Sequence, residues 1–291
     1  AKQIYQWFHV KLADSAEEMT NLPKSLREIM DSQEIYGVSV VTRLISDEDG
    51  TNKFLFRLHD GNVIESVLMK YKHGNSVCIS SQVGCRMGCR FCASTLDGLV
   101  RNLTPAEMLE QIYRISADTG ERVSNVVVMG TGEPLDNYDN LLTFIRMLTD
   151  ENGLHISQRN LTVSTCGLVP RIRDLAKEGL QITLALSLHA SNQEKRLELM
   201  PVAKAYDIHE AVDAMQDYFE ETGRRVTFEY SLVAGVNDTE EDAKELAELI
   251  HGINCHVNLI PVNPIKERDF VQPDGKAVQE FKNKLEKCRI N

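Results

Sequence analysis

The sequence contains no run of 18 apolar residues, so no segment predicts a transmembrane helix. Its first residues, AKQIYQWFHVKLADS, have the pattern of an amphipathic helix and lack the apolar centre of a signal peptide. An excess of positive charge is also absent, because the chain has 32 Lys and Arg against 43 Asp and Glu, which gives a net charge of −11. We therefore expect a cytoplasmic protein that does not contact a membrane and does not coat nucleic acid by bulk electrostatic attraction.

The seven cysteines do not form the even set that a disulfide framework requires. Four of them lie between Cys78 and Cys92, where Cys85, Cys89 and Cys92 follow the spacing CxxxCxxC. Glycines in this loop allow the backbone to turn sharply, so the three thiolates can converge on one centre. This pattern predicts a four-iron, four-sulfur cluster in which one iron atom has no protein ligand and is free to bind a small molecule.

Three other interpretations of these cysteines stay open. A structural zinc ion would need a fourth ligand, for which Cys78, His73 or Cys166 is available. A disulfide framework is disfavoured in a chain of intracellular type with an odd number of cysteines, and chance clustering of small core residues is the third alternative. Analysis of iron and sulfide in the anaerobically purified protein separates these interpretations.

Hydrophobic periodicity divides the 291 residues into four predicted segments. Helical spacing predicts an N-terminal helical accessory domain over 1–33, and period-two alternation predicts an antiparallel β extension over 34–75. Strands that are apolar on both faces alternate with helices over 76–270, and 271–291 predicts a C-terminal helix. After the cysteine loop, strands are predicted at 125–130, 161–165, 182–188, 226–232 and 256–262.

With the strand before the cysteine loop, these make six strand–helix units and predict an α/β fold with a partial (β/α)6 barrel. In such barrels the functional residues gather at the carboxyl ends of the strands. Glu133 follows one predicted strand and could hold an ammonium group through a charge-assisted hydrogen bond. An open iron site beside such groups suits S-adenosylmethionine, whose amine and carboxylate can bind iron.

Several motifs occur in a fixed order along the chain: CxxxCxxC, MGTGEPLDN, LTVSTCGLVP, LALSLHA and LIPVNP. In this order they resemble the RlmN/Cfr family of radical SAM RNA adenosine methyltransferases over essentially the whole chain. The segments SQVGCRMGCRFCAS and DGLVRNLTPAE are closer to the RlmN branch, which methylates adenine C2 in 23S rRNA and in tRNA, than to the Cfr branch, which methylates C8. The resemblance implies a radical SAM barrel, RNA partners and an electron donor such as a flavodoxin-type protein. We expect a monomer.

The resemblance also implies a role for each matching position. Cys85, Cys89 and Cys92 would ligate a [4Fe–4S] cluster. Glu65 matches the family's proton acceptor, although its strand pattern alone would place it on the solvent face, and Cys78 matches the family's resolving thiol. The positions that would bind S-adenosylmethionine are Gly132, Glu133, Ser164, Ser187, Leu188, His189 and Asn263.

The chemistry of adenine explains why such a site needs a radical. Carbon 2 lies between two ring nitrogens and is not nucleophilic, so a sulfonium methyl group cannot reach it by displacement. In the family, two S-adenosylmethionine molecules are used per turnover. One methylates a protein cysteine, and the radical from the second removes hydrogen from that methyl group. The carbon radical attacks the base, a carboxylate removes the ring proton, and the resolving cysteine forms a disulfide that frees the product.

The family's methyl-carrying cysteine has no match in the printed sequence. It lies in a C-terminal motif of the ACGQL type, whereas this chain ends in KCRIN. Cys288 lacks the flanking residues of that motif, and Cys166 and Cys255 are most simply small barrel residues. A different methyl carrier and a lost activity are alternatives, but we expect a tail that is missing from this chain. Such a chain binds the cluster and S-adenosylmethionine without completing turnover.

Other functions stay open. A Cfr-like enzyme would methylate C8, and a radical SAM enzyme with a small-molecule or protein substrate would not bind RNA even at low salt. A non-enzymatic RNA-binding module built on zinc would be colourless and contain no iron.

Overall fold

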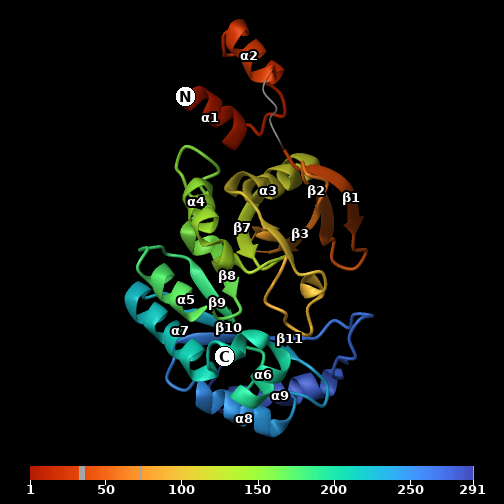
Figure 1. Ribbon diagram of the computed structural model, residues 1–291, viewed down its shortest axis with the longest axis vertical. Coiled ribbons are helices and arrows are strands. Elements are labelled where there is room, and N and C mark those ends of the chain that lie inside the picture. Colours follow the sequence, from red (N-terminus) through yellow and green to blue (C-terminus); the bar gives the residue numbers. More distant parts are fainter. Residues whose placement is uncertain (33–36, 73, 291) are drawn as a thin grey trace. The chain divides into compact units, whose positions relative to one another are not determined.

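The computed structural model describes residues 1–32, 37–72 and 74–290 (Figure 1). His73, the possible zinc ligand, lies outside the described residues. The chain divides into two compact units. The first unit consists of Ala1–Val83, Asn102–Thr131 and Asp139–Leu161, and the second of Gly84–Arg101, Gly132–Tyr138 and Thr162–Asn291. The predicted boundaries of the four sequence segments stay a prediction.

The first unit begins with the helical segment that the periodicity predicted. It contains α1 (Lys2–His9), the 3₁₀ turn η1 (Ala16–Glu18) and α2 (Lys24–Asp31). Trp7 and Phe8 of α1 pack on buried Met19 and Leu22, so the aromatic residues form a small core of their own. The indole N–H of Trp7 donates a hydrogen bond to Asn21.

The antiparallel extension is also present in the first unit. It consists of β1 (Ser39–Ile45), β2 (Asn52–Arg57) and β3 (Val63–Tyr71), and β3 pairs in the antiparallel sense with β4 (Gly74–Cys78). The direction then changes, because β4 pairs in parallel with β7 (Val123–Val128). The connection between them contains α3 (Pro105–Thr119), which begins at the predicted capping box of Thr104 and Glu107. The helix α4 (Tyr138–Leu148) and the turn η4 (Gln158–Asn160) follow.

The second unit is built on four parallel strands in the order β8, β9, β10, β11. These are β8 (Leu161–Thr165), β9 (Thr183–Ser187), β10 (Val226–Leu232) and β11 (Cys255–Pro261). Leu184, Ala185 and Leu186 in succession are fully buried, which is the burial on both faces that parallel strands require. All five strands predicted after the cysteine loop lie within two residues of their predicted bounds.

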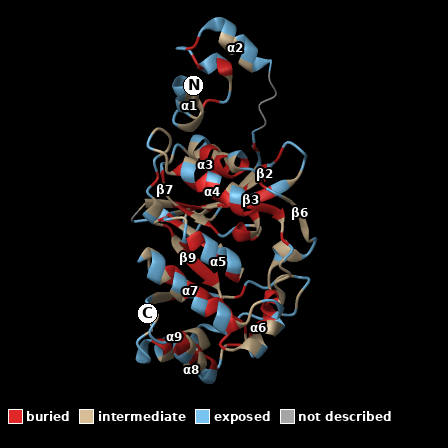
Figure 2. Ribbon diagram, turned by 60° about the vertical axis from the view of Figure 1, so that its left-hand side comes forward, coloured by how far each residue is buried: buried red, intermediate tan, exposed pale blue. Residues whose placement is uncertain are grey.

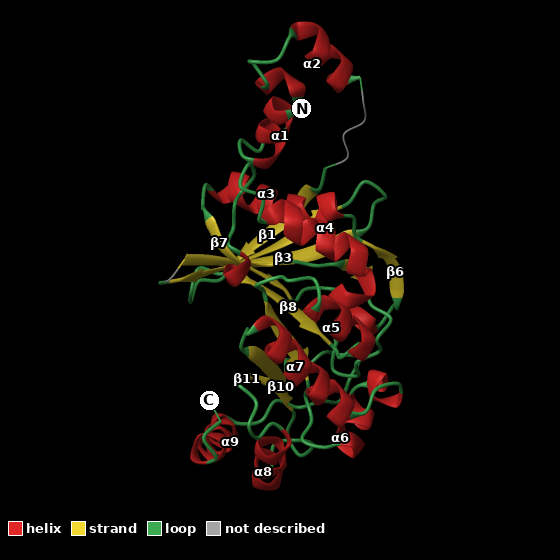
Figure 3. Ribbon diagram, turned by 90° about the vertical axis from the view of Figure 1, so that its left-hand side faces the viewer, coloured by secondary structure: helices red, strands yellow, loops and turns green. Residues whose placement is uncertain are grey.

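Helices cover the strands of the second unit (Figure 3). They are α5 (Val169–Ala176), α6 (Gln193–Leu199), α7 (Ile208–Thr222), α8 (Glu240–Leu249) and α9 (Gly275–Lys287). Figure 2 shows α5 and α7 buried on one side and exposed on the other, as amphipathic helices on a sheet should be. The sequence did not predict α6 or the turn η5 (Pro201–Lys204) that follows it. Among the described residues, no helix combines the length and apolar character that a bilayer crossing requires.

Candidate cluster and cofactor site

The cysteine loop of the second unit is closed by backbone hydrogen bonds. It lies between β5 (Gln82–Gly84) and β6 (Leu99–Asn102), with the turn η2 (Ala93–Thr95) inside it. The amide of Cys85 donates to the carbonyl of Gly98 at 2.9 Å. The Thr95 hydroxyl donates to the carbonyls of Cys89 at 3.0 Å and Cys92 at 2.9 Å. These contacts fix the backbone on which the three thiols are carried.

Gly84 is required for this closure. Its φ is +72°, and a Cβ at this position would lie 2.0 Å from the carbonyl oxygen of Gly98. A side chain cannot be accommodated there unless the loop opens. The glycine that precedes the first cysteine is therefore a structural part of the loop.

Burial and neighbouring groups change the pKa of two of the three thiols. Burial, together with Glu133 and the neighbouring thiols, raises the pKa of Cys85 to about 11 and that of Cys89 to about 12. Within the described parts of the chain, no group of three or more His, Cys, Asp or Glu side chains is gathered tightly enough to hold one metal ion. A four-iron cluster does not require such a group, because it binds each thiolate through a different iron atom.

The segment of α6 and η5 supports the cysteine loop, a contact that the sequence did not reveal. Met87, Cys89 and Phe91 pack against a core of buried residues made of Cys166, Leu199, Met200 and Val202. The amide of Arg90 donates to the Leu199 carbonyl at 2.9 Å. The segment of α6 and η5 is thus the platform on which the cysteine loop rests.

Glu133 is buried, with 3% of its surface exposed. One carboxylate oxygen accepts the Leu135 amide at 3.0 Å, and the other accepts the Cys166 amide at 2.7 Å. Burial raises the pKa of Glu133, while these hydrogen bonds lower it. Gly132 before it has a φ of +110°, and Asp136 after it forms an ion pair with Arg86 of the cysteine loop. The predicted ammonium ligand is therefore held rigidly by several hydrogen-bond donors.

The ends of β8 and β9 bring two predicted residues together. The hydroxyls of Ser164 and Ser187 lie 3.2 Å apart. Leu188 and His189 follow, and their amides donate to the carbonyl of Glu229 on β10 at 3.0 Å and 3.2 Å. Asn263 lies after the end of β11 and is exposed.

His189 is a neutral imidazole with a defined tautomer. Its Nδ1 accepts the Ser231 amide at 2.8 Å, so the ring proton is on Nε2. Burial and, to a smaller extent, the charge of Arg196 lower the pKa of His189 to about 3. Its φ of +55° is unusual for a residue other than glycine, and its carbonyl accepts the side-chain amide of Asn237 at 2.8 Å. The ring packs edge-on against Phe91 of the cysteine loop, with centroids 4.8 Å apart.

Arg196 was not among the predicted site residues. Its side chain is fully buried, and Nη2 donates to the carbonyl of Cys166 at 2.8 Å. Within the described residues, its Nε and Nη1 have no hydrogen-bond partner. Arg196, Leu199 and Met200 lie at positions i, i+3 and i+4 of one helical face, so recognising α6 would have placed the arginine beside the core.

These side chains fit an anionic iron–sulfur cluster. Three thiolates around an iron core carry net negative charge, and a buried guanidinium with two nitrogens that find no partner among the described residues is the complement that such a group requires. The fit therefore rests on the chemistry of the donors and on the orphaned arginine.

Glu65 and Cys78 belong to the first unit and lie on one face of its sheet. Val67 on β3 pairs directly with Cys78 on β4, and Glu65 is two residues from Val67 on the same face, which makes Glu65 and Cys78 diagonal neighbours. The Glu65 carboxylate is half exposed and forms an ion pair with Lys53 at 2.9 Å. Burial raises the pKa of Cys78 to about 11. The predicted base and the predicted resolving thiol are therefore neighbours.

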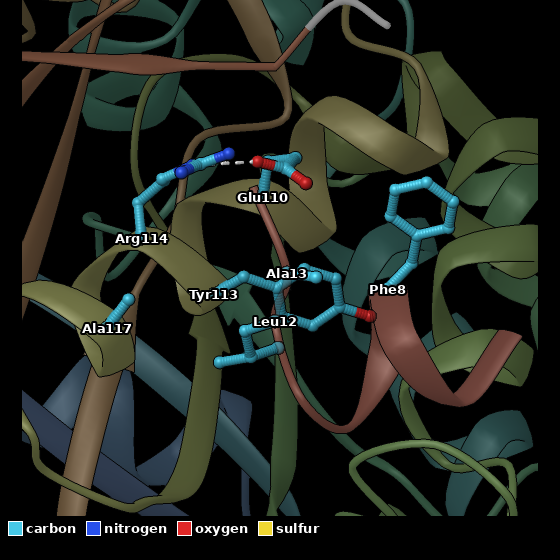
Figure 4. A pocket seen from close by; sticks show the side chains of 7 residues that line it. All are labelled: Phe8, Leu12, Ala13, Glu110, Tyr113, Arg114 and Ala117. Atoms are coloured by element: carbon cyan, nitrogen blue, oxygen red, sulfur yellow. Dashed lines mark hydrogen bonds and ion pairs between the residues drawn. The ribbon is translucent and has the colours of Figure 1, made fainter. Parts of the chain in front are cut away.

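A separate pocket in the first unit is unrelated to these residues. Figure 4 shows its lining of Phe8, Leu12, Ala13, Glu110, Tyr113, Arg114 and Ala117, with the ion pair between Arg114 and Glu110. Its volume is about 10 Å³, which is room for about one water molecule. A cofactor does not fit there.

Comparisons with known proteins show the family to which the chain belongs. The sequence model of the radical SAM superfamily matches residues 79–250, and that of the ribosomal RNA large subunit methyltransferase N-terminal domain matches 1–35. The probable dual-specificity RNA methyltransferase RlmN of Lachnoclostridium phytofermentans is 64% identical over 292 residues, which cover 100% of this chain and 82% of that protein. The protein of the same name from Lachnospira eligens is also 64% identical, with 83% of its length covered.

A solved structure gives the same result for the fold. A radical SAM methyltransferase from Sphaerobacter thermophilus matches with a TM-score of 0.95 and 44% identity, over 99% of this chain and 86% of that one. The predicted α/β fold with a partial barrel of the radical SAM type is thereby confirmed.

Proposed function

The chain belongs to the radical SAM superfamily and, within it, to the RlmN family of RNA methyltransferases, and on that premise we propose that it methylates carbon 2 of adenosine in 23S rRNA and in tRNA. The observation that carries this proposal is the 64% identity, over the whole chain, to relatives named dual-specificity RNA methyltransferases. The family implies a [4Fe–4S] cluster and S-adenosylmethionine as cofactors.

Cys85, Cys89 and Cys92 would hold the cluster on the closed loop. When bound, the cluster supplies the electron that cleaves the sulfonium of S-adenosylmethionine and releases a 5′-deoxyadenosyl radical. The loop's contacts with the α6 and η5 segment exclude water from the inner side of Cys89, which packs among apolar side chains. A dry site protects a reactive carbon radical from side reactions.

The carboxyl ends of the strands would bind S-adenosylmethionine. Glu133 is held by two backbone amides, and its negative charge would attract the ammonium group. His189 offers an Nε2–H donor whose tautomer is fixed by the Ser231 amide. The remaining positions proposed for this ligand are Gly132, Ser164, Ser187, Leu188 and Asn263.

Glu65 and Cys78 would act on the RNA base. Lys53 orients the Glu65 carboxylate, which accepts the proton from carbon 2 of adenine. Cys78 is a protonated thiol at neutral pH because burial raises its pKa to about 11, so a base must remove its proton before it can form a disulfide.

The proposal includes further features of the reaction. Two S-adenosylmethionine molecules are used per turnover, one as the methyl source and one as the radical source. The electron donor is a flavodoxin-type protein, and the enzyme acts as a monomer in the cytoplasm, where its RNA substrates are found.

The test uses the full-length enzyme, reconstituted anaerobically with iron and sulfide. It is incubated with a reductant, S-adenosylmethionine and either a 23S rRNA fragment or tRNA, and the digested nucleosides are identified by mass spectrometry. We expect 2-methyladenosine from both RNAs, and none from a Cys89→Ala control. Production of 8-methyladenosine instead would replace the proposal with a Cfr-like activity. Cofactor cleavage without RNA methylation would favour a different substrate.

A further inference from the structure

We propose that Arg196 is the charge partner of the iron–sulfur cluster and sets its reduction potential. The inference rests on the proposed cluster ligands of the preceding section and extends them by one residue. It concerns the cluster alone, so it can be tested without RNA.

The first observation is the burial of an unbalanced cation. Arg196 is the largest fully buried side chain among the described residues. Within the described chain, its side chain makes one hydrogen bond, from Nη2 to the Cys166 carbonyl, and no carboxylate forms an ion pair with it. A buried guanidinium with no ion pair is strongly destabilising, so its presence calls for an anion at this place.

The second observation is where the guanidinium lies. The neighbours that act electrostatically on it are Cys166, Cys89 and Asp207, of which Cys89 is a proposed cluster ligand. Leu199, three residues further along α6, accepts the Arg90 amide of the cysteine loop and packs in the same core as Cys89. The helix that carries the arginine is thus the helix on which the cysteine loop rests.

The third observation is the space reserved for the guanidinium. A Cβ at Gly167 would lie 3.0 Å from Nη2 of Arg196, and Gly167 has a φ of +103°. The backbone of Cys166 contacts both charged groups of the site, because its N–H donates to Glu133 and its carbonyl accepts from Arg196. The site therefore holds one buried carboxylate and one buried guanidinium at fixed places.

The sign of the effect follows from charge. The reduced cluster carries one more negative charge than the oxidised cluster, so a fixed positive charge nearby favours the reduced form and raises the reduction potential. Glu133 acts in the opposite sense. Without Arg196, the cluster would be harder to reduce, and cleavage of S-adenosylmethionine would need a stronger electron donor.

Two substitutions at one position separate charge from structure. Arg196→Gln removes the charge but keeps a donor for the Cys166 carbonyl, and Arg196→Lys keeps the charge. The matched control is Arg173→Met on α5, which removes an exposed arginine whose ion pair with Asp217 spans 3.0 Å. Circular dichroism and iron content establish that each full-length variant is folded and loaded.

The measurement is a redox titration followed by electron paramagnetic resonance, without S-adenosylmethionine. We expect Arg196→Gln to lower the reduced-to-oxidised ratio at a given potential at least tenfold, which is about 59 mV for a one-electron couple. Arg196→Lys and Arg173→Met should stay near the unsubstituted enzyme. A folded Gln variant that loses iron while the Lys variant keeps it would support the same role.

An unchanged reduction potential in the folded, loaded Arg196→Gln variant would overturn the inference. If S-adenosylmethionine binding were weakened in the same variant, the arginine would be assigned to that ligand's carboxylate instead. If RNA methylation failed in the unsubstituted enzyme but the potential still shifted, the proposed function would fall and the role of Arg196 would stand.

Discussion

Gly84 offers a sharp test of the loop that carries the thiols, because the same loop contains its own control. Gly84 and Gly98 both have a φ of +72°. A Cβ at Gly84 would lie 2.0 Å from the Gly98 carbonyl oxygen, whereas a Cβ at Gly98 meets nothing within 4 Å. The variants Gly84→Ala and Gly98→Ala therefore share the backbone penalty and differ in the collision.

The difference in free energy can be worked out from these contacts. A left-handed conformation costs an alanine about 1–2 kcal/mol in either variant. Gly84→Ala adds about 1–3 kcal/mol for the forced displacement and about 1 kcal/mol for the weakened hydrogen bond from Cys85 to Gly98. The extra cost of about 2–4 kcal/mol reduces the population of the closed loop about 30-fold to 1,000-fold relative to Gly98→Ala. A domain typically has about 5–15 kcal/mol of stability, so the rest of the unit should stay folded.

The assay is iron and sulfide content after anaerobic reconstitution, with urea unfolding monitored by circular dichroism. We expect Gly98→Ala to retain most of its iron and Gly84→Ala to lose most of it at similar helical content. Equal iron content in the two variants would refute the argument that closure at Gly84 holds the cysteine loop in place.

Further predictions concern the other site residues. Glu65→Gln should abolish RNA methylation, measured by nucleoside analysis, while leaving S-adenosylmethionine cleavage intact. Lys53→Met should lower the free energy of unfolding by no more than about 1 kcal/mol, measured by urea unfolding, because its ion pair with Glu65 is exposed. Cys78→Ser should accumulate a covalent protein–RNA species on denaturing gels, and free product at normal yield would contradict the resolving role. Burial lowers the pKa of His189 from 6.5 to about 3, so the unfolded state alone binds a proton as the pH falls from 6.5 toward 3, and stability is lost over that window. His189→Asn should flatten this part of the pH profile of unfolding, and an unchanged slope would show that another group titrates there. Glu133→Gln should weaken S-adenosylmethionine binding at least tenfold in equilibrium dialysis, with iron content unchanged.

The sequence by itself determined the local chemistry. The spacing of Cys85, Cys89 and Cys92 is a property of one short segment, so it could be recognised without any tertiary contact. The strands of the second unit were predicted within two residues because parallel strands buried on both faces are continuous apolar runs. The capping box at Thr104 fixed the start of α3 in the same local way.

Only the tertiary structure decided which distant residues share a site. Arg196 is an ordinary helix residue in the sequence, and its burial beside Cys89 depends on how α6 packs under a loop about 100 residues earlier in the chain. Likewise, Glu65 is an exposed acid, and only the register of β3 and β4 shows that it lies on the same face of the sheet as Cys78. Spacing along the chain records which groups are neighbours in sequence, but burial and charge balance arise from packing between segments, which no local pattern encodes.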